Sequence, residues 1–148
     1  MRGYLFDTMV HVAAEDGIPV KWRRHWKEAT VGKKDLILFE LLVAEILNQL
    51  TKRKGENASR NRILWLKGLR NIKMVDIDDN SAFEASRLYL SMRRHSISLV
   101  DSFVLAIAKK ERAKVFTSDH KLRNAARDIK VEVNYLPRES LSKQTLTF

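Results

Sequence analysis

Short apolar runs alternate with segments of helical spacing along this sequence, and that alternation restricts the possible folds more than any other feature. Runs typical of buried strands occupy residues 3–7, 35–39, 72–77, 115–117 and 131–136. The segments between them repeat their apolar residues at helical spacing. Strands that alternate with helices form a mostly parallel sheet covered by helices. We therefore expect an α/β fold of three layers, α/β/α, around a central, mostly parallel sheet.

The start of one helix can be predicted from a local pattern. Ser81 and Glu84 form the S-x-x-E arrangement of a capping box, in which each side chain bonds the other residue's backbone amide. We therefore expect the helix that follows the third strand to open at Ser81.

The length and composition indicate a single globular domain over residues 1–148. No apolar stretch reaches the ~18 residues of a membrane span. Residues 1–16 lack the basic start and long apolar core of a signal peptide. The chain contains no cysteine, which excludes disulfides and thiolate metal sites. We expect a cytoplasmic protein that does not bind membranes.

The charge balance is strongly basic, with a formal net charge of +10 and a pI near 10.0. A nucleic acid is the natural partner, because neutralising phosphates supplies affinity independent of sequence. A soluble basic protein, or one with an acidic protein partner, is the alternative. Basic residues cluster at 21–34, 52–73 and 109–130, although such runs are usually solvated helix faces.

Four carboxylates lie within or at the ends of apolar runs: Asp7, Glu45, Asp101 and Asp119. Burying a charge among apolar neighbours costs several kcal/mol unless something pairs with it. If the four converged, each like-charged pair at ~4 Å would cost roughly 4 kcal/mol at an effective dielectric constant of about 20. A divalent cation removes that cost, so the pattern predicts a metal site.

Each acid also has a structural interpretation. Asp7 follows a predicted strand, where functional groups of α/β proteins gather, but it can equally cap the next helix. Ser98 and Asp101 match a capping box. The helix that they open is apolar nearly all round, which places Asp101 near the centre of the fold. Asp119 can cap the helix expected from residue 122, and Thr117 shares its side of the extended segment.

The second helix carries two candidates, Glu40 and Glu45. Five residues at about 100° each separate their directions by ~140°, so both are not expected to face one pocket. Glu40, at the helix start, can interact with the helix dipole instead. Spacing alone does not choose between them.

Such a cluster is suited to metal-assisted hydrolysis. Carboxylates are hard oxygen ligands that Mg²⁺ or Mn²⁺ prefers, and one or two such ions can promote cleavage of a phosphodiester. Together with the basic charge, this indicates a nuclease. Substrate phosphates would need nearby cations, and four candidates flank the last two acids: Lys109, Lys110, Lys121 and Arg123.

The assembled segments resemble the PIN-domain family, and within it the VapC-like ribonuclease toxins, over nearly the whole chain. Residues 4–8 resemble the family's opening strand with its first acidic residue, and 42–48 resemble the helix that carries its glutamate. Residues 98–108, the most specific match, are similar to its third acidic segment, and 115–119 to its T-x-D segment. The sequence departs from the family at Met9, where an asparagine is common.

The resemblance implies a PIN-like domain with the acids at the carboxyl edge of a parallel sheet. It implies that Asp7, Glu45 and Asp101 hold Mg²⁺ or Mn²⁺, and it favours Glu45 over Glu40. Asp119 would complete the site directly or through water, and Thr117 would position that carboxylate or a water. It further implies endonuclease action on RNA, a cognate antitoxin protein and a homodimer.

Other functions remain alternatives. A haloacid-dehalogenase-type phosphatase needs a second aspartate where Met9 stands. A nuclease of the RNase H type uses similar carboxylates on a mixed sheet, and a degenerate PIN domain would bind nucleic acid or protein without catalysis. His11, His25, His95 and His120 form no ligand pattern. Trp22 and Trp26, four residues apart, fit a core or an interface better than base stacking.

Overall fold

The computed structural model describes residues 2–145, and side chains within residues 2–141. Its elements are, in chain order, β1 (Tyr4–Phe6), α1 (Thr8–Ala14), η1 (Val20–Trp22), α2 (Arg23–Thr30), β2 (Leu36–Leu38), α3 (Glu40–Lys54), α4 (Glu56–Lys67), β3 (Ile72–Met74), α5 (Asp79–Ser91), η2 (Arg93–His95), α6 (Leu99–Glu111), β4 (Lys114–Thr117), α7 (His120–Asp128), β5 (Val133–Tyr135) and α8 (Arg138–Thr145).

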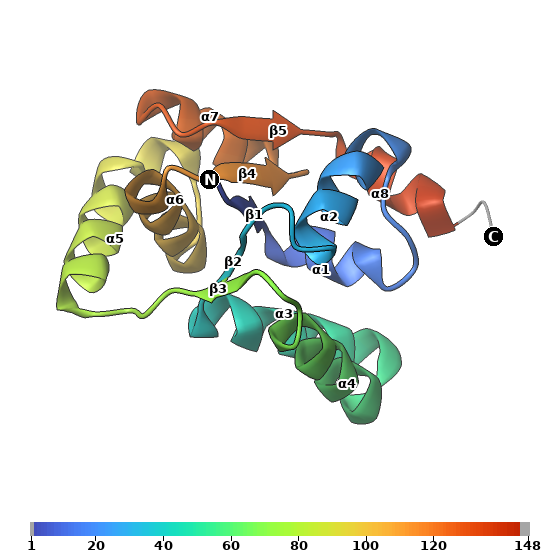
Figure 1. Cartoon of the computed structure of the whole chain (residues 1–148). Coiled ribbons are helices and arrows are strands. Elements are labelled where there is room, and N and C mark those ends of the chain that lie inside the picture. The colour runs from blue at the N-terminus through green and yellow to red at the C-terminus, as the bar shows by residue number, and fades with distance from the viewer. Residues whose placement is uncertain (1, 146–148) are drawn as a thin grey trace.

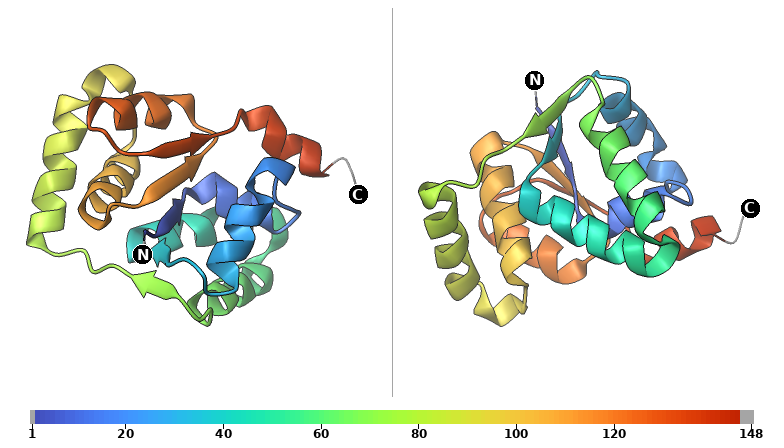
Figure 2. Two further views of the ribbon diagram at one scale, coloured as in Figure 1. Left: turned by 45° about the horizontal axis from the view of Figure 1, so that its top comes forward. Right: turned by 90° about the horizontal axis from the view of Figure 1, so that it is seen from below.

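The five strands form one sheet in the order β3-β2-β1-β4-β5, and every neighbouring pair is parallel. The expected three-layer α/β/α arrangement is confirmed, since helices cover both faces of this sheet. In Figure 1 the strands follow one another from β5 at the top down to β3, with α7 beside β5 and α3 and α4 below β3. Figure 2 shows α5 beside α6, and these two helices pack against each other. Because β1 is the central strand, residues that follow it lie in the middle of the carboxyl edge.

The core explains why these short segments become strands and which helices are central. All three residues of β1 and of β2 are buried, as expected for strands covered on both faces. Helix α6 is apolar nearly all round, and it begins with the predicted capping box, in which Ser98 and Asp101 bond each other's backbone amides. The capping box therefore fixes the local geometry of the first turn of α6.

Helix α5 begins earlier than predicted. Asp78 is its N-cap, and the Asp78 carboxylate accepts a hydrogen bond of 2.8 Å from the Ser81 backbone amide. The expectation that Ser81 opens the helix is wrong, because Asp78 already satisfies the amide of Ser81 three residues later. The Ser81 side chain is buried instead.

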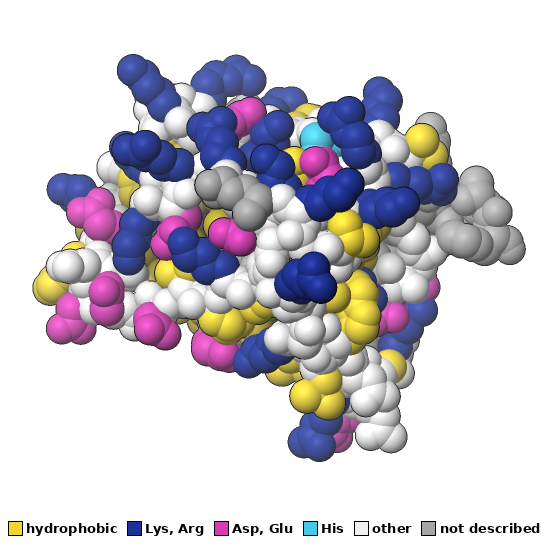
Figure 3. Space-filling view, in the orientation of Figure 1, with side chains coloured by type: hydrophobic (Ala, Val, Ile, Leu, Met, Phe, Trp, Pro, Cys, Tyr) yellow, Lys and Arg dark blue, Asp and Glu magenta, His cyan; other side chains and the backbone are white. Residues whose placement is uncertain are grey.

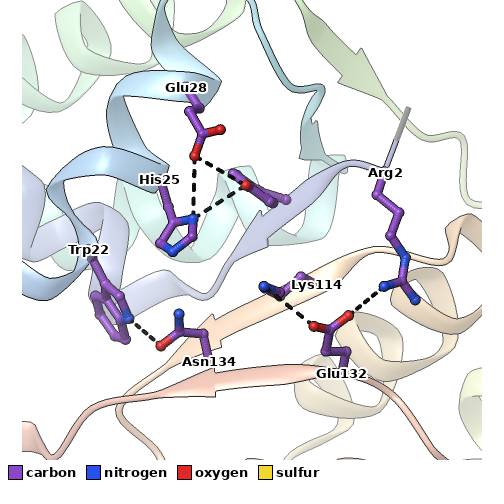
Figure 4. Close-up of polar contacts among 8 residues, drawn as sticks. Arg2, Trp22, His25, Glu28, Lys114, Glu132 and Asn134 are labelled. Atoms are coloured by element: carbon purple, nitrogen blue, oxygen red, sulfur yellow. Dashed lines mark hydrogen bonds and ion pairs between the residues drawn. The ribbon is translucent and has the colours of Figure 1, made fainter.

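The tryptophans belong to the core. Trp22 is fully buried, and its indole Nε1 donates a 2.8 Å hydrogen bond to Asn134 Oδ1 on β5 (Figure 4). Trp26 is half-buried and meets the Phe6 ring edge-on at 5.0 Å between centroids. The pair therefore fixes η1 and α2 against the sheet. No helix within residues 2–145 has the length and apolar character needed to cross a membrane.

Candidate active site

A cavity of about 200 Å³ lies at the carboxyl edge of the sheet, beside the ends of β1 and β4. Asp7 follows β1, Asp119 follows β4, and Asp101 and Glu45 come from α6 and α3. All four predicted acids line this one cavity. The remaining lining residues are Thr8, Met9, Gln49, Val104, Ser118 and Arg138.

Asp7 is the most deeply placed of the acids, with 9% of its surface exposed. It is the N-cap of α1, and its carboxylate accepts hydrogen bonds from the Val10 amide at 3.2 Å and from the Thr117 hydroxyl. Burial raises the pKa of Asp7 to about 7 against the opposing effect of these two hydrogen bonds. The charges of Asp101 and Asp119 contribute to this rise. The carboxylate is thus held in a place that disfavours its own charge.

Thr117 connects two of the acids. It is fully buried at the end of β4, where its hydroxyl donates to Asp7 and accepts a 3.0 Å hydrogen bond from the Asp119 backbone amide. Asp119 is also the N-cap of α7, and its Oδ1 accepts from the Lys121 amide at 2.8 Å. The capping role considered for Asp119 and its position on the cavity therefore occur together.

The structure separates the two glutamates of α3. Glu45 lines the cavity, and its Oε1 accepts a 2.7 Å hydrogen bond from the hydroxyl of Thr8. Glu40 is exposed on another side of the helix, where its carboxylate pairs with Lys67 at 2.9 Å. Their angular separation around the helix axis accounts for the difference.

Asp101 combines a capping role with electrostatic coupling to the other acids. Its carboxylate accepts a 3.1 Å hydrogen bond from the Ser98 amide. Burial raises the pKa of Asp101, the hydrogen bonds with Ser98 oppose that rise, and the charges of Asp119 and Glu45 add to it. The acids of this cavity therefore interact even where their side chains do not touch.

The predicted convergence of the carboxylates on one metal is not seen. Among residues 2–145, no group of three Asp, Glu or His side chains is arranged to hold a metal ion. Each carboxylate instead accepts hydrogen bonds from its own neighbours. Asp7 accepts from Thr117 and Val10, and Glu45 accepts from Thr8. Asp101 accepts from the Ser98 amide, and Asp119 accepts from the Lys121 amide. The donor set itself fits a hard divalent cation, because it consists of carboxylates whose mutual repulsion such an ion would relieve.

The four predicted RNA contacts occupy different places. Lys109 and Lys110 lie in the last turn of α6, roughly 12 Å along the helix axis from Asp101. Lys110 lines a separate cavity beside α5. Lys121 lines a cavity adjoining the acids, and the Arg123 guanidinium lies 4.2 Å from the centre of the Tyr135 ring. Figure 3 shows lysine and arginine side chains gathered over the edge formed by α7 and β5.

Sequence reasoning missed the roles of Thr8 and Arg138. Thr8 directly follows Asp7, and a hydroxyl beside a candidate ligand was the available signal. Arg138 had none, because nothing local connects it to the acids. Of the histidines, His11 is fully buried against Phe6 and Trp26, whereas His120 lines the adjoining cavity.

Comparisons with known proteins agree with this geometry. The PIN domain family model matches residues 4–128. VapBC2 of Rickettsia felis, solved on a DNA fragment from its promoter, superposes with a TM-score of 0.68 and 15% identity, covering 89% of this chain and 97% of that chain. VapC20 of Mycobacterium tuberculosis, a Sarcin-Ricin loop cleaving toxin, superposes with a TM-score of 0.61 and 15% identity, covering 83% of this chain and 95% of that chain. A chain of a Klebsiella pneumoniae toxin-antitoxin complex superposes with a TM-score of 0.56 and 18% identity, covering 80% of this chain and 88% of that chain. No curated protein sequence matches.

Proposed function

The chain belongs to the PIN domain family, and from that premise we propose that it is a metal-dependent endoribonuclease, the toxin of a toxin–antitoxin pair. One observation carries the proposal: four acids from four separate elements line a single cavity at the carboxyl edge of the sheet. The net charge of +10 supports a polyanionic substrate. The toxin–antitoxin complex among the structural neighbours supports an antitoxin partner, and the proposal includes a homodimer.

In this proposal Asp7, Glu45 and Asp101 hold Mg²⁺ or Mn²⁺, and Asp119 completes the site directly or through water. When bound, the ion stabilises charge on the phosphodiester and lowers the pKa of the attacking water. Thr117 keeps the carboxylate of Asp7 oriented and holds the backbone of Asp119 beside it. Thr8, which directly follows Asp7, orients Glu45 through its hydroxyl.

The raised pKa values of Asp7 and Asp101 support an electrostatic role for the cavity. Perturbed carboxylates gathered in a cavity are characteristic of functional sites, although ion-pair networks also produce them. Asp7, Asp101 and Asp119 also cap helices, but capping alone does not require the three carboxylates to be gathered around one cavity, where their charges repel each other. A degenerate PIN domain that only binds a partner would not need its acids gathered in this way.

The test is cleavage of RNA by the purified protein with Mg²⁺ or Mn²⁺. Wild type should cleave, and Asp7→Asn, Glu45→Gln and Asp101→Asn should each lower the rate by about a hundredfold or more, equivalent to about 3 kcal/mol of lost transition-state stabilisation. Glu40→Gln is the matched control, since Glu40 lies on the same helix but outside the cavity. Absence of metal-dependent cleavage by wild type, or full activity of all three variants, would refute the proposal.

A further inference from the structure

An arginine from the far end of the sequence lines the acidic cavity. Arg138 is the first residue of α8, and it shares the cavity with Asp7, Glu45, Asp101 and Asp119. Its position is anchored on both sides, because Leu136 before it and Leu141 after it are buried in the core. Helix α8 also packs against α1, which begins at the site.

The guanidinium of Arg138 is not used by the fold. Within the described part of the chain, it forms no hydrogen bond or ion pair, and Arg138 is exposed. Arginine presents a planar array of donors that matches the oxygens of a phosphate in a bidentate manner. An unpaired guanidinium on an anchored backbone at the rim of an acidic cavity is therefore available to an anion that enters the cavity.

A second cavity of about 440 Å³ continues from the first. The two share Ser118, Asp119 and Arg138, so Arg138 lies at their junction. The second cavity adds His120, Lys121, Tyr135 and Glu139 to its walls. Its volume lies within the range of about 300–1,000 Å³ that small-molecule sites occupy. The second cavity therefore has the size of a nucleotide site, and it opens beside the carboxylates.

The walls of the second cavity combine an aromatic ring with cations. Tyr135 is half-buried at the end of β5, and the Arg123 guanidinium stacks on its ring at 4.2 Å. Such stacking restricts the ring, and an ordered aromatic ring is a platform for a base. Lys121 supplies a further cation from the first turn of α7. The acids Asp119 and Glu139 also line this cavity, so the cations act locally and do not create a uniformly basic surface.

We propose that Arg138 binds the RNA phosphate next to the scissile bond, and that the adjoining nucleotide occupies the second cavity with its base on Tyr135 and its outer phosphate near Lys121. This inference rests on the proposed function, because the subsite is defined by its position next to a bond that is cleaved at the four acids. It assigns the chain a nucleotide-binding subsite that recognises single-stranded RNA by phosphate contacts and stacking.

The experiment separates binding from cleavage. Fluorescence anisotropy measures the Kd of a fluorescein-labelled oligouridine decamer in EDTA, between about 50 and 200 mM NaCl. Arg138→Ala should weaken binding at least fivefold and reduce the slope of log Kd against log salt by about 0.7, the value for one phosphate contact on a single strand. Arg138→Lys should restore most of the slope, because it keeps the charge.

Two further variants complete the design. Tyr135→Leu should weaken binding fivefold or more without changing the salt slope, as expected for the loss of base stacking. It should have no effect on a decamer whose nucleotides are abasic. Arg127→Ala is the matched control, since Arg127 is an exposed cation on the same helix as Lys121 and lines neither cavity. It should stay within twofold of wild type.

The outcomes distinguish this inference from the proposed function. If wild type cleaves RNA but Arg138→Ala and Tyr135→Leu leave Kd, KM and the salt slope unchanged, the subsite is refuted and the nuclease proposal stands. If wild type does not cleave RNA but Arg138→Ala alters binding as described, the nuclease proposal is refuted and the subsite stands. Failure of wild type to bind the decamer at the lowest salt also refutes the subsite.

Discussion

Thr117 donates a hydrogen bond to the carboxylate of Asp7, which lies 110 residues earlier in the chain. The same hydroxyl accepts a hydrogen bond from the Asp119 amide. One buried side chain thus fixes the relative positions of the acids that follow β1 and β4. This contact exists because the two strands are parallel neighbours, with Phe6 aligned to Phe116.

Thr117→Val should therefore lower RNA cleavage by about 10–100-fold, the range found when an outer-shell partner of a metal ligand is removed. Valine keeps the shape of threonine, but it can neither donate to Asp7 nor accept from Asp119. Thr117→Ser, which keeps the hydroxyl, should retain most of the activity. Steady-state cleavage rates of the two variants decide this, and full activity of Thr117→Val would show that the hydroxyl is not needed.

Thr8→Val tests the hydrogen bond between Thr8 and Glu45. Loss of the 2.7 Å hydrogen bond to Glu45 should weaken Mn²⁺ binding about tenfold, because the carboxylate loses its orientation. Isothermal titration with Mn²⁺ measures the effect. Thr8→Ser should bind as wild type does, and unchanged affinity in Thr8→Val would argue that Glu45 is positioned without Thr8.

Asp7→Asn should stabilise the metal-free protein at high pH. Burial raises the pKa of Asp7 from 3.8 to about 7, so the folded state favours the protonated acid. The stability that Asp7 contributes is therefore fully present below pH 4, and it is lost as the pH rises to 7. The two pKa values correspond to a difference of about 4 kcal/mol at most.

Urea unfolding in EDTA measures this effect. Asp7→Asn should exceed wild type in free energy of unfolding by about 2–4 kcal/mol at pH 8, and the two curves should approach each other near pH 4. Lower stability of Asp7→Asn at pH 8 would mean that the hydrogen bonds from Thr117 and Val10 outweigh the burial of the charge.

A divalent cation should stabilise the folded protein. Binding at a hundred times Kd adds about 2.7 kcal/mol to the free energy of unfolding, which raises Tm by several degrees. Removal of the ion with EDTA should reverse the rise. Asp101→Asn should lose most of the Mn²⁺-dependent shift, whereas Glu40→Gln should keep it. Differential scanning fluorimetry gives the readout without any RNA, and an equal shift in both variants would place the ion elsewhere.

Much of the fold could be predicted because its signals are local. Buried strands of three or four residues leave continuous apolar runs, and a capping box such as Ser98 with Asp101 is contained within four residues. The predicted helix start was wrong at α5, where Asp78 and Ser81 offered competing caps, and at α7, which begins at His120 and not at residue 122. The positions of Asp7 and Asp119 could also be predicted from the sequence. Asp7 directly follows an apolar run, and Asp119 lies two residues after the end of another.

The sequence by itself determined the alternation of elements, the acids beside them and the basic charge. Only the tertiary structure decided which side chains meet. It brought Glu45 and not Glu40 to the cavity, left Lys109 and Lys110 at the far end of α6, and brought Arg138 to the acids. The physical reason is that local hydrogen bonding and periodicity fix each element, whereas strand order and helix packing bring together residues distant in the chain.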